Sequence, residues 1–332
     1  MALSFSIDTD QILELDEYVD YVKHNVDLLD LDSIAASAPQ FRALMNNRRV
    51  ITDVINQQLT DWSTFQAGNT YTAQTFMLAF SPGFYLRANI WAPLSDIPEI
   101  RAAESQNYYY MIPHDHNFSF MTGGYLGSGY RTAIWEYDHE TIAGVRGEKV
   151  DLRFLEHTSL PEGKIMVYRK SIDVHHQEHA DEFSISLNLM VIPDETVTNR
   201  SNQFIFDSDA GSLKSVLSSS AGRIAFCELA QHVGDSKTAG LLDELSTLHP
   251  DSRLRGACIR SLTKMFPGDS ESIFERASRD KHPYVKQLGV RGLQGSHLAE
   301  AEYLKQAVDH HAAFDSGAGG RDAAPHDNMV VD

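Results

Sequence analysis

Two histidines separated by one residue are the clearest candidates for chemistry in this sequence. His114 and His116 lie in the run Ile112-Pro-His-Asp-His. On a β-strand, residues i and i+2 share a face, so both imidazoles would point the same way and could bind one metal ion. Imidazole suits zinc, copper, iron and nickel, so the ligand type alone does not choose the metal. A single His-x-His pair is weak evidence, and a third ligand is needed.

A second group of histidines, further along the chain, offers that third ligand. His175, His176 and His179 stand between two runs that predict strands. A strand that places Ile172 and Val174 on one face places His175 on the other. This alternation favours His175, while His176 and His179 stay open as alternatives. Histidine clusters with ligand spacing indicate a metal site better than single residues do.

The sequence predicts short strands as the elements that position these histidines. Residues 68–195 hold aromatic and β-branched runs separated by Gly, Pro, Asn and Asp, and a glycine-rich turn follows His116. Such runs predict an antiparallel sandwich or barrel. The runs that we expect as strands include 84–91, 130–137, 164–169 and 183–191.

Helical segments flank this region on both sides. Residues 1–66 predict an N-terminal helical segment that packs on the next domain, and the β domain then extends over 67–207. Residues 208–311 predict a helical domain with an internal repeat, because His249-Pro and His282-Pro begin similar stretches that end in Arg260-Ser-Leu and Arg291-Gly-Leu. That pattern favours a small HEAT-like solenoid. Residues 312–332 predict a disordered tail.

The composition excludes several function classes. A net charge of −18 with no basic patch argues against a nucleic-acid partner. The apolar runs are too short for a membrane helix, and the first residues lack the basic and apolar parts of a secretory signal. Two cysteines, Cys227 and Cys258, do not indicate a disulfide framework, so we expect a cytoplasmic protein.

These motifs together resemble the cupin superfamily, and within it the cysteine dioxygenase-type thiol dioxygenases. There, a strand that ends in Trp precedes Ile-His-Asp-His, as the run 84–91 precedes His114 here. The run from Tyr168 to His175, followed by Ser186-Leu-Asn-Leu, resembles the family segment that bears the third histidine. The resemblance covers about residues 70–195 and implies a cupin β-barrel with N-terminal helices and a C-terminal HEAT-like domain.

The resemblance also implies a cofactor and a reaction. It assigns His114, His116 and His175 as ligands of Fe(II), with dioxygen and a small molecule, such as an amino-acid or thiol derivative, as substrates. Tyr110, Tyr130 and Arg87 are the residues that we expect to orient the substrate. The glutamate ligand of many cupins is absent, because residues 118–121 are Phe-Ser-Phe-Met.

Two departures from the thiol dioxygenases bear on the substrate. Met121 stands near the cysteine that forms a cross-link in animal cysteine dioxygenases, and residues 64–83 hold no arginine or lysine for a substrate carboxylate. Free cysteine is therefore a poor candidate substrate. Two other interpretations stay open: a non-redox isomerase or hydrolase-like cupin that uses a divalent metal, and a ligand-binding cupin whose helical repeat binds a protein partner.

Overall fold

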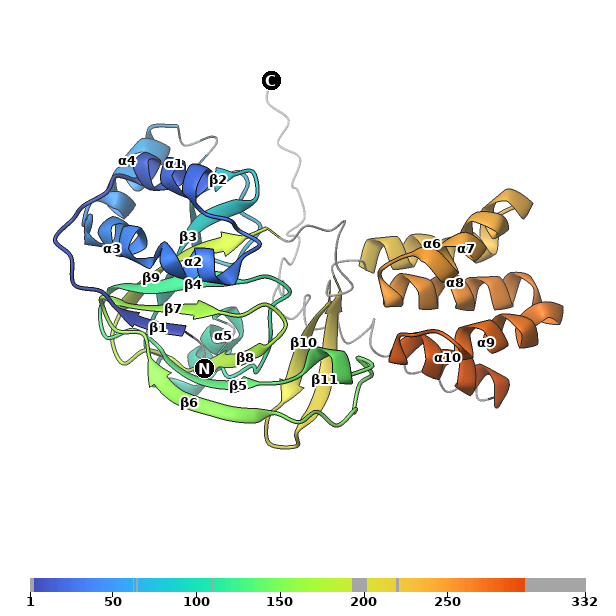
Figure 1. Cartoon of the computed structure of the whole chain (residues 1–332). Coiled ribbons are helices and arrows are strands. Elements are labelled where there is room, and N and C mark those ends of the chain that lie inside the picture. The colour runs from blue at the N-terminus through green and yellow to red at the C-terminus, as the bar shows by residue number, and fades with distance from the viewer. Residues whose placement is uncertain are drawn as a thin grey trace, which may run out of the picture.

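The computed structural model describes residues 3–61, 63, 65–108, 110–192, 202–218 and 221–295. Antiparallel sheets form the body of the protein, N-terminal helices cover one side of it, and a group of C-terminal helices stands beside it (Figure 1). The predicted combination of antiparallel sheets and helices is confirmed. The strand pairings of the described residues form a large sheet and a small sheet, the small one made of a three-stranded and a two-stranded part, and they do not close into a barrel.

The large sheet has six strands in the order β1-β7-β4-β9-β3-β2, and all its neighbours are antiparallel. Its strands, in chain order, are β1 (Leu3–Ser6), β2 (Thr75–Ser81), β3 (Phe84–Trp91), β4 (Phe120–Leu126), β7 (Lys164–Tyr168) and β9 (Ser184–Val191). Within residues 1–66, where we expect a helical segment, residues 3–6 form the strand β1. Residues 3–6 alternate between partly buried and exposed positions and pair with the edge strand β7.

The small sheet contains two of the third-ligand candidates, His175 and His176. It is formed by β6 (Arg153–Ser159), β5 (Arg131–Glu136) and β8 (Asp173–Gln177), and by the hairpin of β10 (Asn202–Asp207) and β11 (Ser212–Ser218). His114 joins these two parts, because it forms one bridge to His175 of β8 and another to Ile205 of β10. The His-x-His segment therefore acts as a short inserted strand.

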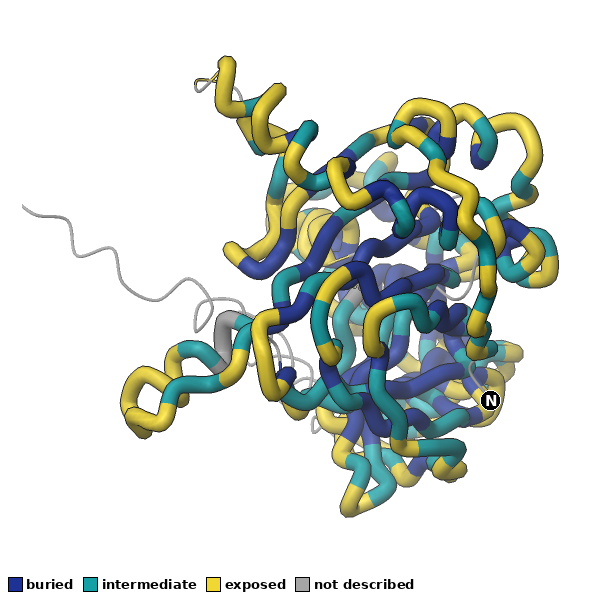
Figure 2. Tube along the Cα trace, turned by 90° about the vertical axis from the view of Figure 1, so that its left-hand side faces the viewer, coloured by how far each residue is buried: buried dark blue, intermediate teal, exposed yellow. Residues whose placement is uncertain are grey.

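Strand alternation divides the core into layers. Ile165 and Val167 of β7 pack with the N-terminal helices, whereas Met166 and Tyr168 of the same strand face Ile134 of the small sheet. The covering helices are α1 (Leu15–Asn25), α2 (Leu31–Ala36), α3 (Ala38–Asn46) and α4 (Val50–Thr60), and α5 (Pro98–Asn107) follows β3. Buried positions concentrate in the strands and exposed positions in the outer turns (Figure 2).

The C-terminal helices pack around α8. They are α6 (Ala221–Val233), α7 (Ser236–Leu248), α8 (Ser252–Met265), α9 (Ser270–Ser278) and α10 (Pro283–Leu293), and the short helices η1 (His139–Thr141) and η2 (Pro267–Asp269) complete the described elements. Buried Arg253 of α8 donates a hydrogen bond to the Gly144 carbonyl, which attaches this group to the β-rich part. No described helix is both long and apolar enough to cross a membrane.

The expected boundary between residues 207 and 208 falls inside a hairpin. Residues 212–218 form β11, which pairs with β10, so helical structure begins at Ala221 and not at residue 208. The Ser-, Gly- and Asp-rich residues 208–211 make the turn that connects β10 to β11, with Gly211 at φ +56°. The predicted disordered tail, 312–332, lies outside the described residues.

Candidate metal centre

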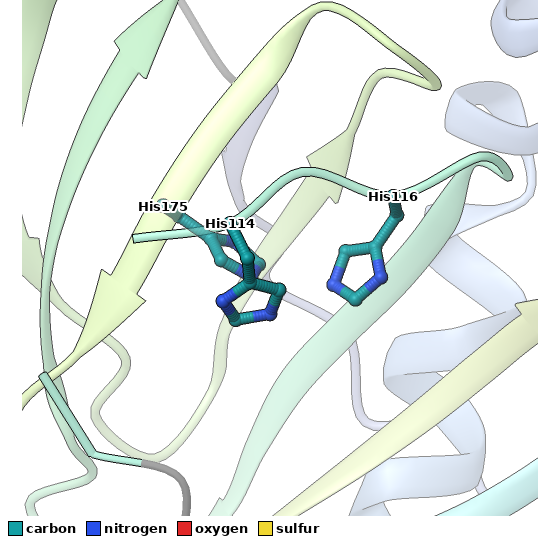
Figure 3. A group of neighbouring side chains, drawn as sticks. All are labelled: His114, His116 and His175. Atoms are coloured by element: carbon teal, nitrogen blue, oxygen red, sulfur yellow. The ribbon is translucent and has the colours of Figure 1, made fainter. Parts of the chain in front are cut away.

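Three histidines meet between the two sheets. His114 and His116 come from the segment before β4, and His175 comes from β8. One ring nitrogen from each lies within 4.8 Å of those of the other two. The ring centroids are 4.7 Å apart for His114 and His175, 4.9 Å for His114 and His116, and 5.2 Å for His116 and His175. Figure 3 shows the three imidazoles on the same side of their backbones. Three ring nitrogens this close together could hold one metal ion.

Hydrogen bonds fix the tautomers of the first two rings. His114 Nδ1 lies 2.7 Å from the Ile112 carbonyl oxygen, and His116 Nδ1 lies 3.1 Å from Gln203 Oε1. Each Nδ1 must donate to its oxygen, so Nε2 carries the lone pair in both rings. Metal-binding histidines commonly donate their other ring N–H to an oxygen in this way. These two rings therefore already have the protonation pattern of metal ligands.

His175 has a buried nitrogen with no partner. Its Nδ1 makes no hydrogen bond, and its Nε2 lies 3.3 Å from the Gln177 amide nitrogen. The residue is only 1% exposed. A buried polar atom without a partner is costly, so the described protein groups alone do not satisfy this ring. The donor set of three imidazoles fits a first-row transition metal.

Burial keeps all three imidazoles neutral. It lowers the pKa of His114 to about 4, and it lowers the pKa values of His116 and His175 well below their ordinary range. Repulsion among the three rings lowers the pKa values of His116 and His175 further, and the nearby charge of Arg87 lowers those of His114 and His116. Only a neutral imidazole can bind a metal, so the ligands need no deprotonation at neutral pH.

Aromatic rings enclose the histidines on the side of the large sheet. Tyr168 lies edge-on to His175 at 4.3 Å between ring centroids, and Phe120 lies 4.9 Å from His116. Phe120 and Tyr168 stack on each other at 4.7 Å, because they are directly paired on β4 and β7. The rings hold the imidazoles in place and keep water from their sides.

Asp115 points away from the histidines, as the strand alternation predicts. Its buried carboxylate accepts hydrogen bonds from the Tyr137 hydroxyl, at 2.6 Å, and from the Phe204 amide. Burial raises the pKa of Asp115 to about 7. The Asp115 side chain thus links the His-x-His segment to β10 on the side opposite to the imidazoles.

The structure separates the three candidates for the third ligand. His176, next to His175 on β8, faces the other way and packs edge-on against Trp135, with its Nε2 3.6 Å from Glu178. His179 lies after the end of β8, with its ring 6.5 Å from that of Tyr110. Only His175 among them belongs to the histidine cluster.

Arg87 stands in a polar row on the inner face of the large sheet. It is paired with Asn188 of β9, which is paired in turn with Thr122 of β4. Directly paired residues share a face, and the next row along holds Phe120 and Tyr168. The Arg87 Nε is buried and makes no hydrogen bond, and its guanidinium lies 4.7 Å from the ring centre of Tyr71. The guanidinium of Arg87 therefore places a positive charge near the histidines.

The two tyrosines expected to orient substrate differ in their surroundings. Tyr130 is buried, packs on Trp91 at 4.2 Å and has its pKa raised to about 12, chiefly by burial. The neighbouring Thr122, Tyr168 and Arg87 each lower the pKa of Tyr130 and so offset part of this rise. The Tyr110 hydroxyl instead donates to the Ala92 carbonyl at 3.1 Å. Tyr130 thus lies in the polar interior, while the hydroxyl of Tyr110 is already engaged with the backbone.

Sequence reasoning missed two residues beside the histidines. Gln203 comes from β10 and Gln177 from β8, and both contact ligand rings. Gln177 follows His175 by two residues, so strand alternation could have placed it on the same face. Nothing local to Gln203 signals its position, because it depends on the pairing of β10 with the His-x-His segment.

Comparisons with known proteins found only distant structural similarity. No protein-family model matches the sequence, and no curated protein is significantly similar to it. A hydroquinone 1,2-dioxygenase structure aligns with TM-score 0.26 and 10% identity over 40% of this chain and 71% of its own. A salicylate 1,2-dioxygenase from Pseudaminobacter salicylatoxidans aligns with TM-score 0.23 and 10% identity over 42% of this chain and 32% of its own. Hydroxypropylphosphonic acid epoxidase from S. wedmorenis aligns with TM-score 0.21 and 10% identity over 52% of this chain and 94% of its own. Such low scores assign neither a family nor an activity to this chain, which spans about a third of the salicylate enzyme.

Proposed function

We propose that this protein is a cupin-type non-heme iron oxygenase that oxidises a small molecule with dioxygen. The observation that carries the proposal is the cluster of His114, His116 and His175, with ring nitrogens within 4.8 Å of one another. These residues would hold Fe(II), and the iron would supply the activation of dioxygen that protein side chains cannot provide. The protein's own contribution is the geometry, the neutral ligand set and the exclusion of water.

The charge of the ligand set bears on the substrate. Three neutral imidazoles leave the full +2 charge on the iron, whereas a carboxylate ligand would reduce it. Arg87 adds a further positive charge on the inner face of the large sheet. An anionic substrate is therefore favoured, with one end at the metal and an acidic group near Arg87. Asn188 and Thr122 would contribute hydrogen bonds to that group, and Tyr130 would contact the substrate from the opposite side.

The roles of the tyrosines follow from their hydrogen bonds. Burial holds Tyr130 as a neutral phenol that can donate to a substrate oxygen, because its pKa is about 12. Tyr110 would act by shape, since its hydroxyl is bound to the Ala92 carbonyl.

Two further expectations accompany this proposal. The C-terminal helices would form a HEAT-like domain, because the repeated His-Pro sequence stands at the start of two of them. The helix α8 begins two residues after Pro250, and α10 begins at Pro283. A cytoplasmic location is supported by Cys227 and Cys258, whose sulfurs lie 3.7 Å apart as thiols. A reducing compartment would keep such a pair open.

The test is anaerobic loading with Fe(II), followed by a screen of anionic small molecules in an oxygen electrode. The proposal predicts one iron per chain and oxygen uptake that depends on substrate. Zinc binding without oxygen uptake would favour the non-redox divalent-metal enzyme, because imidazole also suits zinc. Ligand binding with no bound metal would favour the ligand-binding cupin.

A further inference from the structure

Gln177 points into the same space as the three histidines. It follows His175 by two residues on β8, so both side chains lie on the same face of this strand. In the pairing of β8 with β5, His175 is opposite Ile134 and Gln177 is opposite Thr132. Ile134 belongs to the core between the two sheets, so Gln177 faces that interior as well. The fold thus places an uncharged amide next to the histidine cluster.

The backbone holds Gln177 from both sides. Its carbonyl oxygen accepts a hydrogen bond from the Met111 amide at 2.9 Å, and Thr132 is its partner on β5. His175 is held in the same way between β5 and His114. The two side chains therefore keep a relation to each other that the strands set and that does not depend on a bound ion.

The contact between these two side chains has the spacing of two ligands on one ion. The Gln177 amide nitrogen lies 3.3 Å from Nε2 of His175. Ligand atoms lie about 2.1 Å from a first-row metal ion, so two neighbouring ligands are roughly 3.0 Å apart at a right angle and roughly 3.4 Å apart at the tetrahedral angle. An ion bound to Nε2 of His175 would therefore have the end of the Gln177 side chain at the distance of a further ligand.

Nε2 is the nitrogen by which His175 would join the other two ligands. His114 and His116 each donate from Nδ1 to an oxygen and keep the lone pair of Nε2. In every imidazole Nδ1 lies on the side of the backbone and Nε2 at the far end of the ring. His114 and His175 are directly paired, so their rings leave the backbone on the same face and their far ends lie together.

A glutamine amide carries both a donor and an acceptor at its end. A half-turn about the last side-chain bond exchanges the positions of Nε2 and Oε1. In a metal-free protein the amide N–H can donate to the lone pair of His175 Nε2, and in a metal-bound protein Oε1 can face the ion. Carbonyl oxygens bind divalent metals without adding charge. An amide ligand would thus preserve the +2 charge on which the preference for an anionic substrate depends.

We infer that Gln177 is a fourth, neutral ligand of the metal centre, bound through Oε1. This inference rests on the metal centre of the proposed function. With four protein ligands, an octahedral ion keeps two positions, one for the substrate and one for dioxygen. The substrate class is then an anion that binds the metal through a single atom and reaches Arg87 with its other end.

Co(II) binding by the full-length protein tests this inference, because the visible absorption of bound Co(II) depends on the number and type of its ligands. Gln177→Glu replaces the amide by a carboxylate of the same length, and Gln177→Leu removes the ligand atom. Relative to wild type, Gln177→Glu should bind Co(II) roughly tenfold more tightly and Gln177→Leu roughly tenfold more weakly. Both variants should change the absorption spectrum of the bound ion.

Two matched controls separate a ligand from simpler roles. Gln203→Glu places the same carboxylate beside Nδ1 of His116, so it adds no ligand and should keep the wild-type spectrum. Gln57→Glu makes the same change of charge at an exposed position on α4 and should keep both the affinity and the spectrum. Circular dichroism should show all variants folded.

Wild-type spectra for both Gln177 variants would overturn the inference and leave Gln177 as a hydrogen-bond partner of His175. Tighter binding by Gln177→Glu without a spectral change would do the same, because it would match the effect of Gln203→Glu. In both cases one Co(II) per chain would still support the metal centre. A wild type that binds no Co(II) would instead refute that centre, and the inference with it.

Discussion

His114 and His175 exchange two backbone hydrogen bonds, each with 2.9 Å between nitrogen and oxygen. This reciprocal pair is a one-residue piece of antiparallel sheet, and it sets both side chains on the same face. On the other side, His114 also forms a bridge with Ile205. The backbone therefore spaces the imidazoles before any ion binds, and removal of the metal should leave the fold in place.

The hydrogen bond from His116 to Gln203 should tune metal affinity. Gln203→Leu removes the oxygen that accepts from His116 Nδ1 and frees the ring to turn. Loss of such a partner typically weakens metal binding by roughly tenfold to a hundredfold. Competition with a chelator of known affinity would measure the change. Gln57→Leu, at an exposed position on α4, is the control and should bind metal like wild type.

Asp115 should make stability depend on pH. The pKa of Asp115 in the folded protein, about 7, lies above the ordinary value of 3.8. Between these pH values the carboxyl therefore keeps its proton in the folded protein and loses it in the unfolded protein. Stability relative to Asp115→Asn should therefore fall as pH rises from about 4 to about 7, by on the order of 4 kcal/mol, and then level off. The histidines titrate in both proteins, so the difference isolates Asp115.

Urea unfolding of the two metal-free proteins at several pH values measures this difference. A relative stability that stays constant across the range, or that rises with pH, would mean that the buried carboxyl ionises at least as easily in the folded as in the unfolded protein.

Arg87 should contribute to the binding of anionic substrates and not to the binding of neutral ones. Once a substrate is found, Arg87→Met should raise its KM by roughly thirtyfold, which corresponds to the loss of about 2 kcal/mol for a charged hydrogen bond. A neutral analogue should keep its KM, and bound iron should be unchanged. The exposed Arg279, changed to Met, is the control. Equal losses on the charged and neutral compounds would indicate a structural role for Arg87.

The parts of the fold that follow local periodicity were predictable. The period-two pattern of strand runs such as 84–91 and 183–191 predicted strands that the structure has as β3 and β9. The strands β1 and β11 were missed, because β1 has only four residues and β11 is rich in serine. Their pairing depends on partners far away in the sequence, which local propensity does not report.

The candidate site, like the fold, could be predicted from the sequence only in part. Alternation on one strand was enough to place His175 opposite to His176, and a spacing of two was enough to join His114 with His116. Gln203 could not be predicted, because its contact requires β10 to lie beside the His-x-His segment. The polar row of Arg87, Asn188 and Thr122 likewise arises from the register of three strands, which a single sequence does not fix.

The most direct test of the central claim is anaerobic Fe(II) binding by wild type, His175→Ala and His176→Ala, measured as iron per chain after desalting. We predict about one iron per chain for wild type and His176→Ala, and almost none for His175→Ala, because His175 alone of the two shares the face of His114 and His116. Circular dichroism should show all three proteins folded. Iron retained by His175→Ala at the wild-type level, or lost from His176→Ala alone, would contradict the three-histidine centre.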